Sequence, residues 1–419
     1  FATLQLATGV FNKAMIKYEE DRDGYTSSML VLTSLITVGI AGICYLFRDI
    51  FGMVIELPGE YMVVLFLEIL SSTALSFWSI RNRFEFRYKS VVGFSMLVCI
   101  LGPVCSVAFI LAVDDAHQGI AKICGMLFIK IVVGVFLAVK ILLRGRKMFS
   151  LPYWAYSVKY NLPLIPHYLS QQVLSQADRI MISRYEGMTA AAIYGVAYQL
   201  SRVVFTFVLA IHQSFTPWAF DNIKKGNYSG IKKNTLILEI GIGALCVFAS
   251  LFAPELIYIV GGEQYMGAVW VVPPVSISVL FQSIYTFYAD IEFYFERTGM
   301  IMTASVVVGI ANVLLNAIFI PIYGYTAAGY TTMVCYILYS FVHYLFMKAI
   351  CRQKGIIVPY NGKAMWAVGL AYATVSVFVG TLYQNTAWRY LLIVSILCGT
   401  AALGFAYRKK IKVWLKLWK

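Results

Sequence analysis

Two neighbouring apolar segments of this chain carry stripes of polar side chains. The first stripe is His167, Gln171, Ser175 and Asp178, and the second is Gln199, Arg202, Thr206 and Gln213. Intervals of three and four residues place such side chains on one face of a helix. The chemistry they offer is charge compensation and hydrogen bonding, and a stripe of this kind cannot face lipid.

Charged residues also occur inside apolar segments. Arg202 lies near the middle of one such segment, and Lys130 near the middle of another. An ionised side chain at the centre of a bilayer costs about 2.5–3.5 kcal/mol, so each needs a partner or a water-filled cavity. Asp178 and Arg202 are about 9 Å apart in depth by helical rise, so Arg202 has three alternatives: this carboxylate, a backbone carbonyl or a cavity.

The bland interpretation of the polar residues is hydrogen bonding between helices. We consider it at least as good as a functional one for Gln171, Ser175 and Thr206. A stripe of Glu68 with three serines resembles the stripes of the second half. Three further acids near the ends of apolar segments are interpreted as solvated helix ends rather than proton sites: Glu239, Asp290 and Glu292.

No catalytic constellation is present in the sequence. The four histidines are scattered, and the eight cysteines lie in or beside apolar segments without a CxxC pair. No HExxH or GxSxG motif occurs. We therefore expect a protein that is not an enzyme and that holds no metal or cofactor.

The elements that position these residues are membrane spans. Of 419 residues, 60% are hydrophobic and 13% are charged, against roughly a quarter charged in soluble domains. Apolar runs of about 20 residues recur along the chain, long enough to cross a bilayer as helices. We predict twelve full spans, near 26–47, 61–80, 90–112, 119–142, 162–184, 189–212, 235–254, 267–290, 300–321, 325–347, 363–383 and 388–407. Residues 1–16 indicate half of one more helix, and the start at Phe1 suggests that an upstream piece, the first helix, is missing.

The basic residues alternate between the two sides of these spans. Most of the 34 lysines and arginines fall on the side of Glu19 and Asp21, including those of the C-terminal tail. Arg48, Lys122, Arg184 and Arg389 fall on the other side. The positive-inside rule then predicts a multi-pass protein of the bacterial inner membrane with basic loops and the C-terminus in the cytoplasm. The net charge of +14 reports topology, and we expect no nucleic-acid partner.

The two halves of the chain show an internal repeat. A span from Leu35 resembles one from Leu238, GEYM at Gly59 parallels GEQYM at Gly262, and FEFRYKS at Phe84 parallels FYFERTG at Phe293. The spacing is about 205–210 residues and holds six spans, which predicts two lobes of the same orientation. We place the N-terminal lobe at 1–147, the C-terminal lobe at 148–350, and a lipid-facing transmembrane hairpin with a basic tail at 351–419.

One stretch resembles a known family. NLPLIPHYLSQQVLSQADRIMISRYEGMTAAAIYGVAYQLS from Asn161 is similar to the segment that opens the second half of bacterial polysaccharide flippases. These belong to the superfamily of multidrug, oligosaccharidyl-lipid and polysaccharide exporters. The resemblance implies two six-helix lobes around a central cavity plus two C-terminal helices. It further implies alternating access, driven by a proton or sodium gradient.

The resemblance also implies a substrate and partners. The substrate is an undecaprenyl-diphosphate-linked oligosaccharide for O-antigen, capsule or exopolysaccharide synthesis, and membrane lipids and polysaccharide polymerases are the partners. Asp178 and Arg179 correspond to the family's Ala-Asp-Arg stretch. Basic residues would neutralise the diphosphate, and polar side chains would bind glycan hydroxyls. The expected cavity residues are Arg202, Asp178, Arg179, Lys130, His167, Gln171, Gln199 and Glu68.

Three alternatives stay open at this point. A cation-coupled multidrug exporter of the same superfamily predicts a cavity of acids and aromatics, which the basic residues disfavour. A membrane-embedded glycan polymerase or ligase predicts a long outer loop, and the outer loops here are short. A scaffolding protein would not explain a repeat with charged helix faces.

Overall fold

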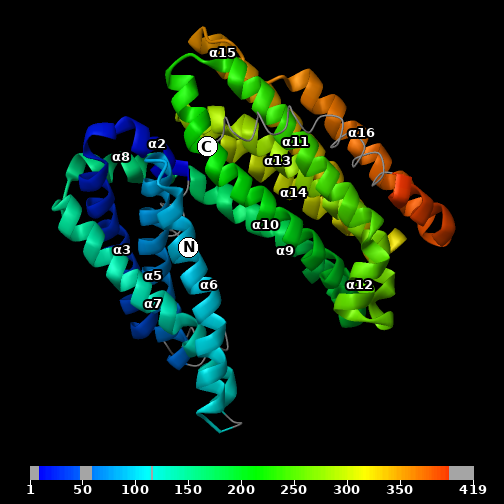
Figure 1. Cartoon of the computed structure of the whole chain (residues 1–419), viewed down its shortest axis with the longest axis horizontal. Coiled ribbons are helices and arrows are strands. Elements are labelled where there is room, and N and C mark those ends of the chain that lie inside the picture. Colours follow the sequence, from blue (N-terminus) through cyan, green and yellow to red (C-terminus); the bar gives the residue numbers. More distant parts are fainter. Residues whose placement is uncertain (1–8, 48–58, 115–116, 396–419) are drawn as a thin grey trace. The chain divides into compact units, whose positions relative to one another are not determined.

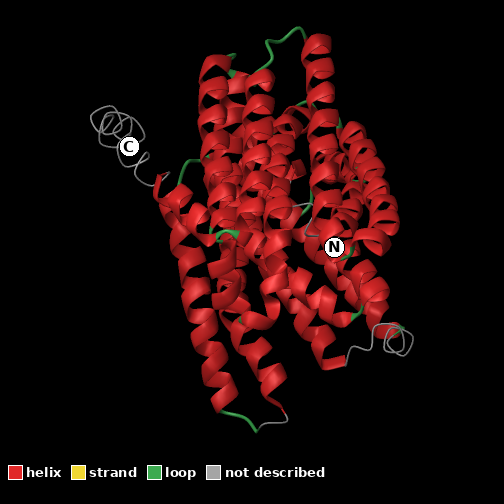
Figure 2. Cartoon of the chain, turned by 90° about the vertical axis from the view of Figure 1, so that its right-hand side faces the viewer, coloured by secondary structure: helices red, strands yellow, loops and turns green. Residues whose placement is uncertain are grey.

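The computed structural model describes residues 9–47, 59–114 and 117–395, and within these ranges it is helical and contains no β-strand (Figure 2). The predicted all-α fold is therefore confirmed. Ten helices in these ranges are long and apolar enough to cross a membrane, and each coincides with a predicted span. Of the other two predicted spans, 162–184 is a helix made less hydrophobic by its polar stripe, and most of 388–407 lies outside the described ranges, as does the basic tail. The number of spans stays a prediction.

Packing divides the chain into two compact units. Unit 1 comprises Phe1–Leu169, Gln213–Asn227 and Asp290–Thr303, and unit 2 comprises Ser170–His212, Tyr228–Ala289 and Ala304–Lys419. Unit 1 thus contains one end of several helices from the second half of the chain. This division follows contacts rather than the repeat, and the predicted lobe boundaries stay predictions.

In unit 1, helices α3, α5, α6 and α7 run side by side (Figure 1). The elements of this unit are α2 (Gly9–Lys17), η1 (Glu19–Asp21), α3 (Arg22–Leu46), α5 (Gly59–Phe84), α6 (Tyr88–Leu111), α7 (Gln118–Gly145) and α8 (Leu151–Asn161). Buried aromatic rings fill the core, with Phe11 stacked on Phe77 at 4.5 Å between ring centroids. Helix α8 occupies part of a segment expected to be a connection, and a hydrogen bond of 2.7 Å between Ser157 and Tyr25 holds it on α3.

The remaining helices lie wholly or mostly in unit 2, and four of them have one end in unit 1. They are α9 (Leu164–Glu186), α10 (Met188–Lys224), α11 (Tyr228–Leu251), α12 (Ala253–Gly261), η3 (Glu263–Val271), α13 (Val272–Tyr294), α14 (Thr298–Tyr323), α15 (Tyr325–Lys354), α16 (Gly362–Thr381) and η4 (Leu382–Gln384). Helix α16 packs along α11, where Tyr372 donates to the carbonyl of Ile240 at 3.0 Å and Ser376 bonds Ser250 at 2.8 Å. One face of the predicted lipid-facing hairpin is therefore packed against protein.

Three helix-to-helix turns share one backbone form. Phe86, Gly226 and Glu296 follow α5, α10 and α13 with φ of 56°, 72° and 58°. The residue after each donates its N–H to the carbonyl five residues earlier at 2.8–2.9 Å, as in a Schellman motif. The first and third turns are about 210 residues apart, so the local structure supports the repeat seen in the sequence.

Candidate functional site

In unit 2, helices α9 and α10 bring two arginines to one phenol. The guanidinium carbon of Arg179 lies 4.5 Å from the ring centroid of Tyr198. Arg202, one helical turn further along α10, also interacts electrostatically with this phenol. The adjacent polar stripes predicted from the sequence therefore meet at Tyr198, a residue that the stripes did not include.

The carboxylate of Asp178 belongs to a different set of contacts. It is fully buried and accepts hydrogen bonds from the hydroxyl of Tyr194 and, at 2.8 Å, from the backbone N–H of Arg179. It makes no ion pair with Arg202. Of the alternatives that the sequence left open for Arg202, the structure thus disfavours Asp178.

The two arginine side chains form no ion pair within the described ranges, although the carboxyl group of Asp178 interacts electrostatically with Arg179. Nε and Nη2 of Arg179 are buried without a hydrogen-bond partner there, and the side chain of Arg202 is exposed. Guanidinium groups bind phosphate and carboxylate oxygens in pairs of parallel hydrogen bonds. Two guanidinium groups that act on one phenol and outnumber the nearby acid are chemically suited to bind an anion.

A buried polar network connects Tyr194 of α10 with α14 and α15. Tyr194 interacts with Thr332 of α15, and Asn312 of α14 donates to Thr332 at 3.4 Å. Asn316 donates to Asn312 at 3.2 Å. These residues were not predicted, although two asparagines four residues apart in an apolar span could have indicated a polar contact between helices. Because this network is buried and internally hydrogen-bonded, we interpret it as positioning α10 and α15 rather than binding ligand.

The other predicted residues of unit 2 are Gln171 and Gln199. Gln171 donates to the hydroxyls of Tyr339 at 3.1 Å and Tyr285 at 3.4 Å, and the two rings are 4.3 Å apart. Gln199 is exposed on α10. Gln171 therefore joins a set of tyrosines on α13 and α15, and no motif distinguishes these from the other tyrosines among the 29 of the chain.

The remaining predicted residues lie in unit 1. Lys130 Nζ is 2.8 Å from Glu68 Oε1, and the two side chains are 33% and 38% exposed. The charges of this pair compensate each other, so Lys130 is less available to an anion than the two arginines. His167, at the start of α9, is buried with its ring 4.8 Å from that of Tyr168.

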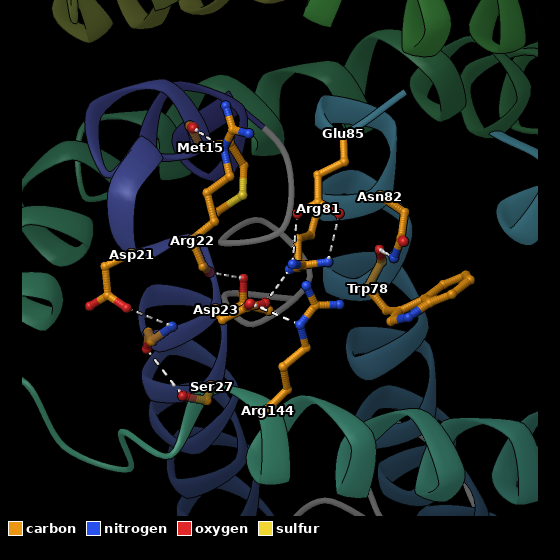
Figure 3. A network of polar contacts seen from close by, with 12 residues as sticks. Met15, Asp21, Arg22, Asp23, Ser27, Trp78, Arg81, Asn82, Glu85 and Arg144 are labelled. Carbon is orange, nitrogen blue, oxygen red and sulfur yellow. Dashed lines mark hydrogen bonds and ion pairs between the residues drawn. The ribbon is translucent and has the colours of Figure 1, made fainter. Parts of the chain in front are cut away.

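A network of ion pairs joins α3, α5 and α7 of unit 1 (Figure 3). The carboxylate of Asp23 forms ion pairs with Nε of Arg81 at 2.5 Å and with Nε of Arg144 at 2.9 Å. Arg81 also forms an ion pair with Glu85, through Nη2 at 2.7 Å. Arg81 is only 4% exposed. The sequence analysis treated these arginines as markers of topology, and the structure shows that they also tie three helices together.

The ends of α10 and α13 contact α2, η1 and α8 within unit 1. Lys224 pairs with Glu19, Tyr156 donates to Glu296 at 2.9 Å, and Tyr160 donates to the carbonyl of Phe293 at 2.6 Å. Burial, and then the charge of Glu296, raise the pKa of Tyr156 well above its usual range, so this phenol stays a donor. We refer to these three pairs as the closing contact.

The interpretation of three acids as solvated helix ends was wrong. Glu239 and Glu292 are fully buried, and Asp290 is 5% exposed and lies 3.4 Å from the hydroxyl of Thr216. The position of these acids near the predicted end of a span did not make their side chains exposed, because neighbouring helices cover them there. Glu239 in particular lies where α16 packs on α11.

Residues 5–223, more than half of the chain, match a family described as polysaccharide biosynthesis protein. No curated protein matches the chain.

Several solved structures share the fold. An outward-facing multidrug resistance MATE family transporter of the MOP superfamily is 15% identical, with 84% of each chain covered and a TM-score of 0.69. A variant of the Vibrio cholerae MATE transporter VcmN is 13% identical, covers 84% of this chain and 85% of that chain, and has a TM-score of 0.69. A MOP superfamily transporter from Pyrococcus furiosus, described as having a binding pocket of reverse polarity, is 14% identical over 83% of this chain and 84% of that chain, with a TM-score of 0.63.

Proposed function

The chain belongs to the polysaccharide biosynthesis protein family, and on this premise we propose that it exports a lipid-linked oligosaccharide across the bacterial inner membrane. The substrate would be an undecaprenyl-diphosphate-linked glycan for O-antigen, capsule or exopolysaccharide synthesis. A polysaccharide polymerase would receive it on the outer side.

The observation that carries the proposal is the pair of arginines around Tyr198. A diphosphate brings negative charge that must be compensated when it leaves water. Arg179 and Arg202 form no ion pair within the described ranges, and the two of them outnumber the one acid nearby, Asp178. Mutual neutralisation gives both groups a lower cost at membrane depth. The polyprenyl tail would stay in lipid, so the protein needs to handle only the diphosphate and the sugars.

The remaining polar residues suit the glycan. Gln171 and the hydroxyls of Tyr285 and Tyr339 offer donors and acceptors of the kind that bind sugar hydroxyls. Transport would proceed by alternating access, with a proton or sodium gradient as the driving force. Within the closing contact, the pair of Lys224 and Glu19 is exposed and can separate at little cost, which supports such a movement.

A cation-coupled multidrug exporter is the second candidate. The matched structure of a multidrug resistance transporter favours it, although identity of this level shows the fold alone. A site for organic cations should present acids and aromatic faces, whereas Asp178 is occupied by Tyr194 and the free charges are positive. The polarity of the cluster therefore supports the anionic substrate.

The test is complementation with matched arginine variants. Full-length protein would be expressed in a strain lacking its polysaccharide flippase, as wild type, Arg179→Ala, Arg202→Ala and Arg184→Ala. Arg184 is the control because it is an exposed arginine at the end of the same helix as Arg179. At matched membrane abundance, we expect wild type and Arg184→Ala to restore surface polysaccharide and the other two to restore less than a tenth of it.

Two results would argue against the proposal. If Arg179→Ala and Arg202→Ala both restored surface polysaccharide fully, the two arginines would not form a required anion-binding site. A wild type that raises drug resistance without restoring polysaccharide, in the strain from which the protein comes, would favour the multidrug exporter.

A further inference from the structure

Glu239 is a buried acid that the proposed site does not use. It lies on α11 in unit 2 and is 0% exposed. Neither of its carboxyl oxygens has a hydrogen-bond partner within the described ranges. Buried polar atoms without partners are rare in folded proteins and call for an explanation.

The groups around Glu239 are neutral. Tyr288 of α13 and Tyr372 of α16 interact with it electrostatically, and the hydroxyl of Tyr288 is itself buried without a described partner. Tyr344 of α15 acts on Tyr288, and Cys246, two turns along α11, acts on Tyr372. No lysine, arginine or histidine in the described ranges acts on the carboxyl.

Helix α16 is what covers this acid. Tyr372 bonds the carbonyl of Ile240, the residue after Glu239. Its ring occupies the space above Gly243, where a Cβ would lie 2.1 Å from a ring carbon. The contact therefore depends on a glycine one turn from the acid, and any movement of α16 away from α11 would let water approach Glu239.

An ionised carboxylate in these surroundings has no favourable interaction. Burying an unpaired charge costs several kcal/mol even by conservative scales, and such groups become neutral instead. A hard metal cation would need about six oxygen ligands, and within the described part of the chain the groups that act on this carboxyl are two phenols. A proton satisfies the carboxyl without further ligands.

We propose that Glu239 is a proton-binding site, occupied while α16 covers α11 and vacated when water reaches the carboxyl. Binding and release are then linked to the position of α16, because the covered form selects the neutral acid and the uncovered form the carboxylate. In an exporter, this link would make the proton the coupling ion, and that last step rests on the proposed function.

Infrared difference spectroscopy of the purified full chain tests proton occupancy directly. The wild-type spectrum minus that of Glu239→Gln at pH 7 should show the carbonyl stretch of a protonated carboxyl. Glu255→Gln is the matched control, since Glu255 is held by Arg389 at 2.5 Å and should contribute carboxylate bands instead. Carboxylate bands in the Glu239 difference spectrum would overturn the proposal. Unfolding midpoints of the variants confirm that they are folded.

A transport assay in vesicles tests coupling separately. With an imposed pH gradient, Glu239→Gln should lose the acceleration that the gradient gives to wild type. An unchanged response would overturn the coupling role while leaving the proton site in place. If no oligosaccharide transport is seen with wild type, the proposed function fails, and the infrared result still decides the proton site.

Discussion

At the scale of single residues, the choice of partner for Asp178 shapes the candidate site. The acid accepts a hydrogen bond from Tyr194 and forms no ion pair with Arg179, although the two groups interact electrostatically. A phenol can satisfy a buried carboxylate without neutralising it. The cluster therefore keeps its positive charge for a substrate.

Tyr194→Phe tests this arrangement. Loss of the hydroxyl leaves a buried carboxylate with fewer hydrogen bonds, which should lower stability by about 1–3 kcal/mol. Asp178 would then compete for Arg179 and weaken binding of a prenyl diphosphate. The measurement is thermal unfolding in detergent, with and without that lipid. Tyr198→Phe, which keeps the ring against Arg179, should change stability and lipid binding little. If Tyr194→Phe has the stability and lipid binding of wild type, the interpretation is contradicted.

Glu255 provides a prediction with a defined pH dependence. Partial burial opposes its ionisation, but hydrogen bonds from Arg389 and Tyr390 hold the pKa of the carboxyl below its usual range. A lowered pKa in the folded state gives stability that is present above the unfolded value of about 4.3 and is lost as the pH falls through the folded value.

The unfolding midpoint should consequently fall as the pH is lowered below about 4.3. In Glu255→Gln, part of that decline should disappear, because the amide does not titrate. Equal slopes in the two proteins would show that the pair contributes nothing measurable.

At the scale of elements, two glycines set the approach of α7 to its neighbours. A Cβ at Gly125 would lie 2.6 Å from the Cα of Ser106 on α6, and one at Gly134 would lie 2.7 Å from the Cα of Ser71 on α5. Both neighbours are backbone atoms, which cannot move without shifting a helix. Small residues at such crossings allow the close packing on which membrane helices depend.

Gly125→Ala should therefore lower the unfolding midpoint, whereas Gly93→Ala on α6, with open space around its Cβ, should leave it unchanged or raise it. The expected cost is on the order of 1–3 kcal/mol, as for overpacked cores. Fluorescence-detected size exclusion after heating measures both variants in one assay. Equal midpoints would mean that α6 and α7 can separate at no cost.

At the scale of the whole molecule, the closing contact joins the first half of the chain to the ends of α10 and α13 within unit 1. Its members range from Glu19 and Lys224, which are 51% and 50% exposed, to Tyr160, which is 5% exposed and belongs to a hydrophobic core cluster. Exposed ion pairs contribute little stability individually. A contact of this kind suits a movement that must be made and reversed.

Cross-linking tests whether that movement is required. In a chain freed of its native cysteines, Glu19→Cys with Lys224→Cys would be bridged by a short bifunctional thiol reagent that a reductant cleaves. We expect transport to stop on bridging and to recover on reduction, with Glu19→Cys alone unaffected by the reagent. Full transport in the bridged protein would show that this end need not open.

Much of the fold follows from the sequence because apolar runs of about 20 residues have few options other than helices across a membrane. The family follows from a local stretch around Asp178. Helical periodicity also indicated that the stripes of α9 and α10 belong to one face each, and helical rise placed Asp178 and Arg202 about 9 Å apart in depth. These properties are local along the chain and need no knowledge of packing.

Only the tertiary structure decided which groups meet. Periodicity shows which side chains share a face of a helix but not which helix lies opposite that face. It could not predict that Asp178 bonds Tyr194 rather than Arg202, or that Lys130 pairs with Glu68. The position of a residue along a span gives its depth but not its burial. Glu239 was therefore predicted to be solvated, whereas α16 packs on α11 and buries it. Burial and pairing depend on residues far away in sequence, and these decide where charge remains for function.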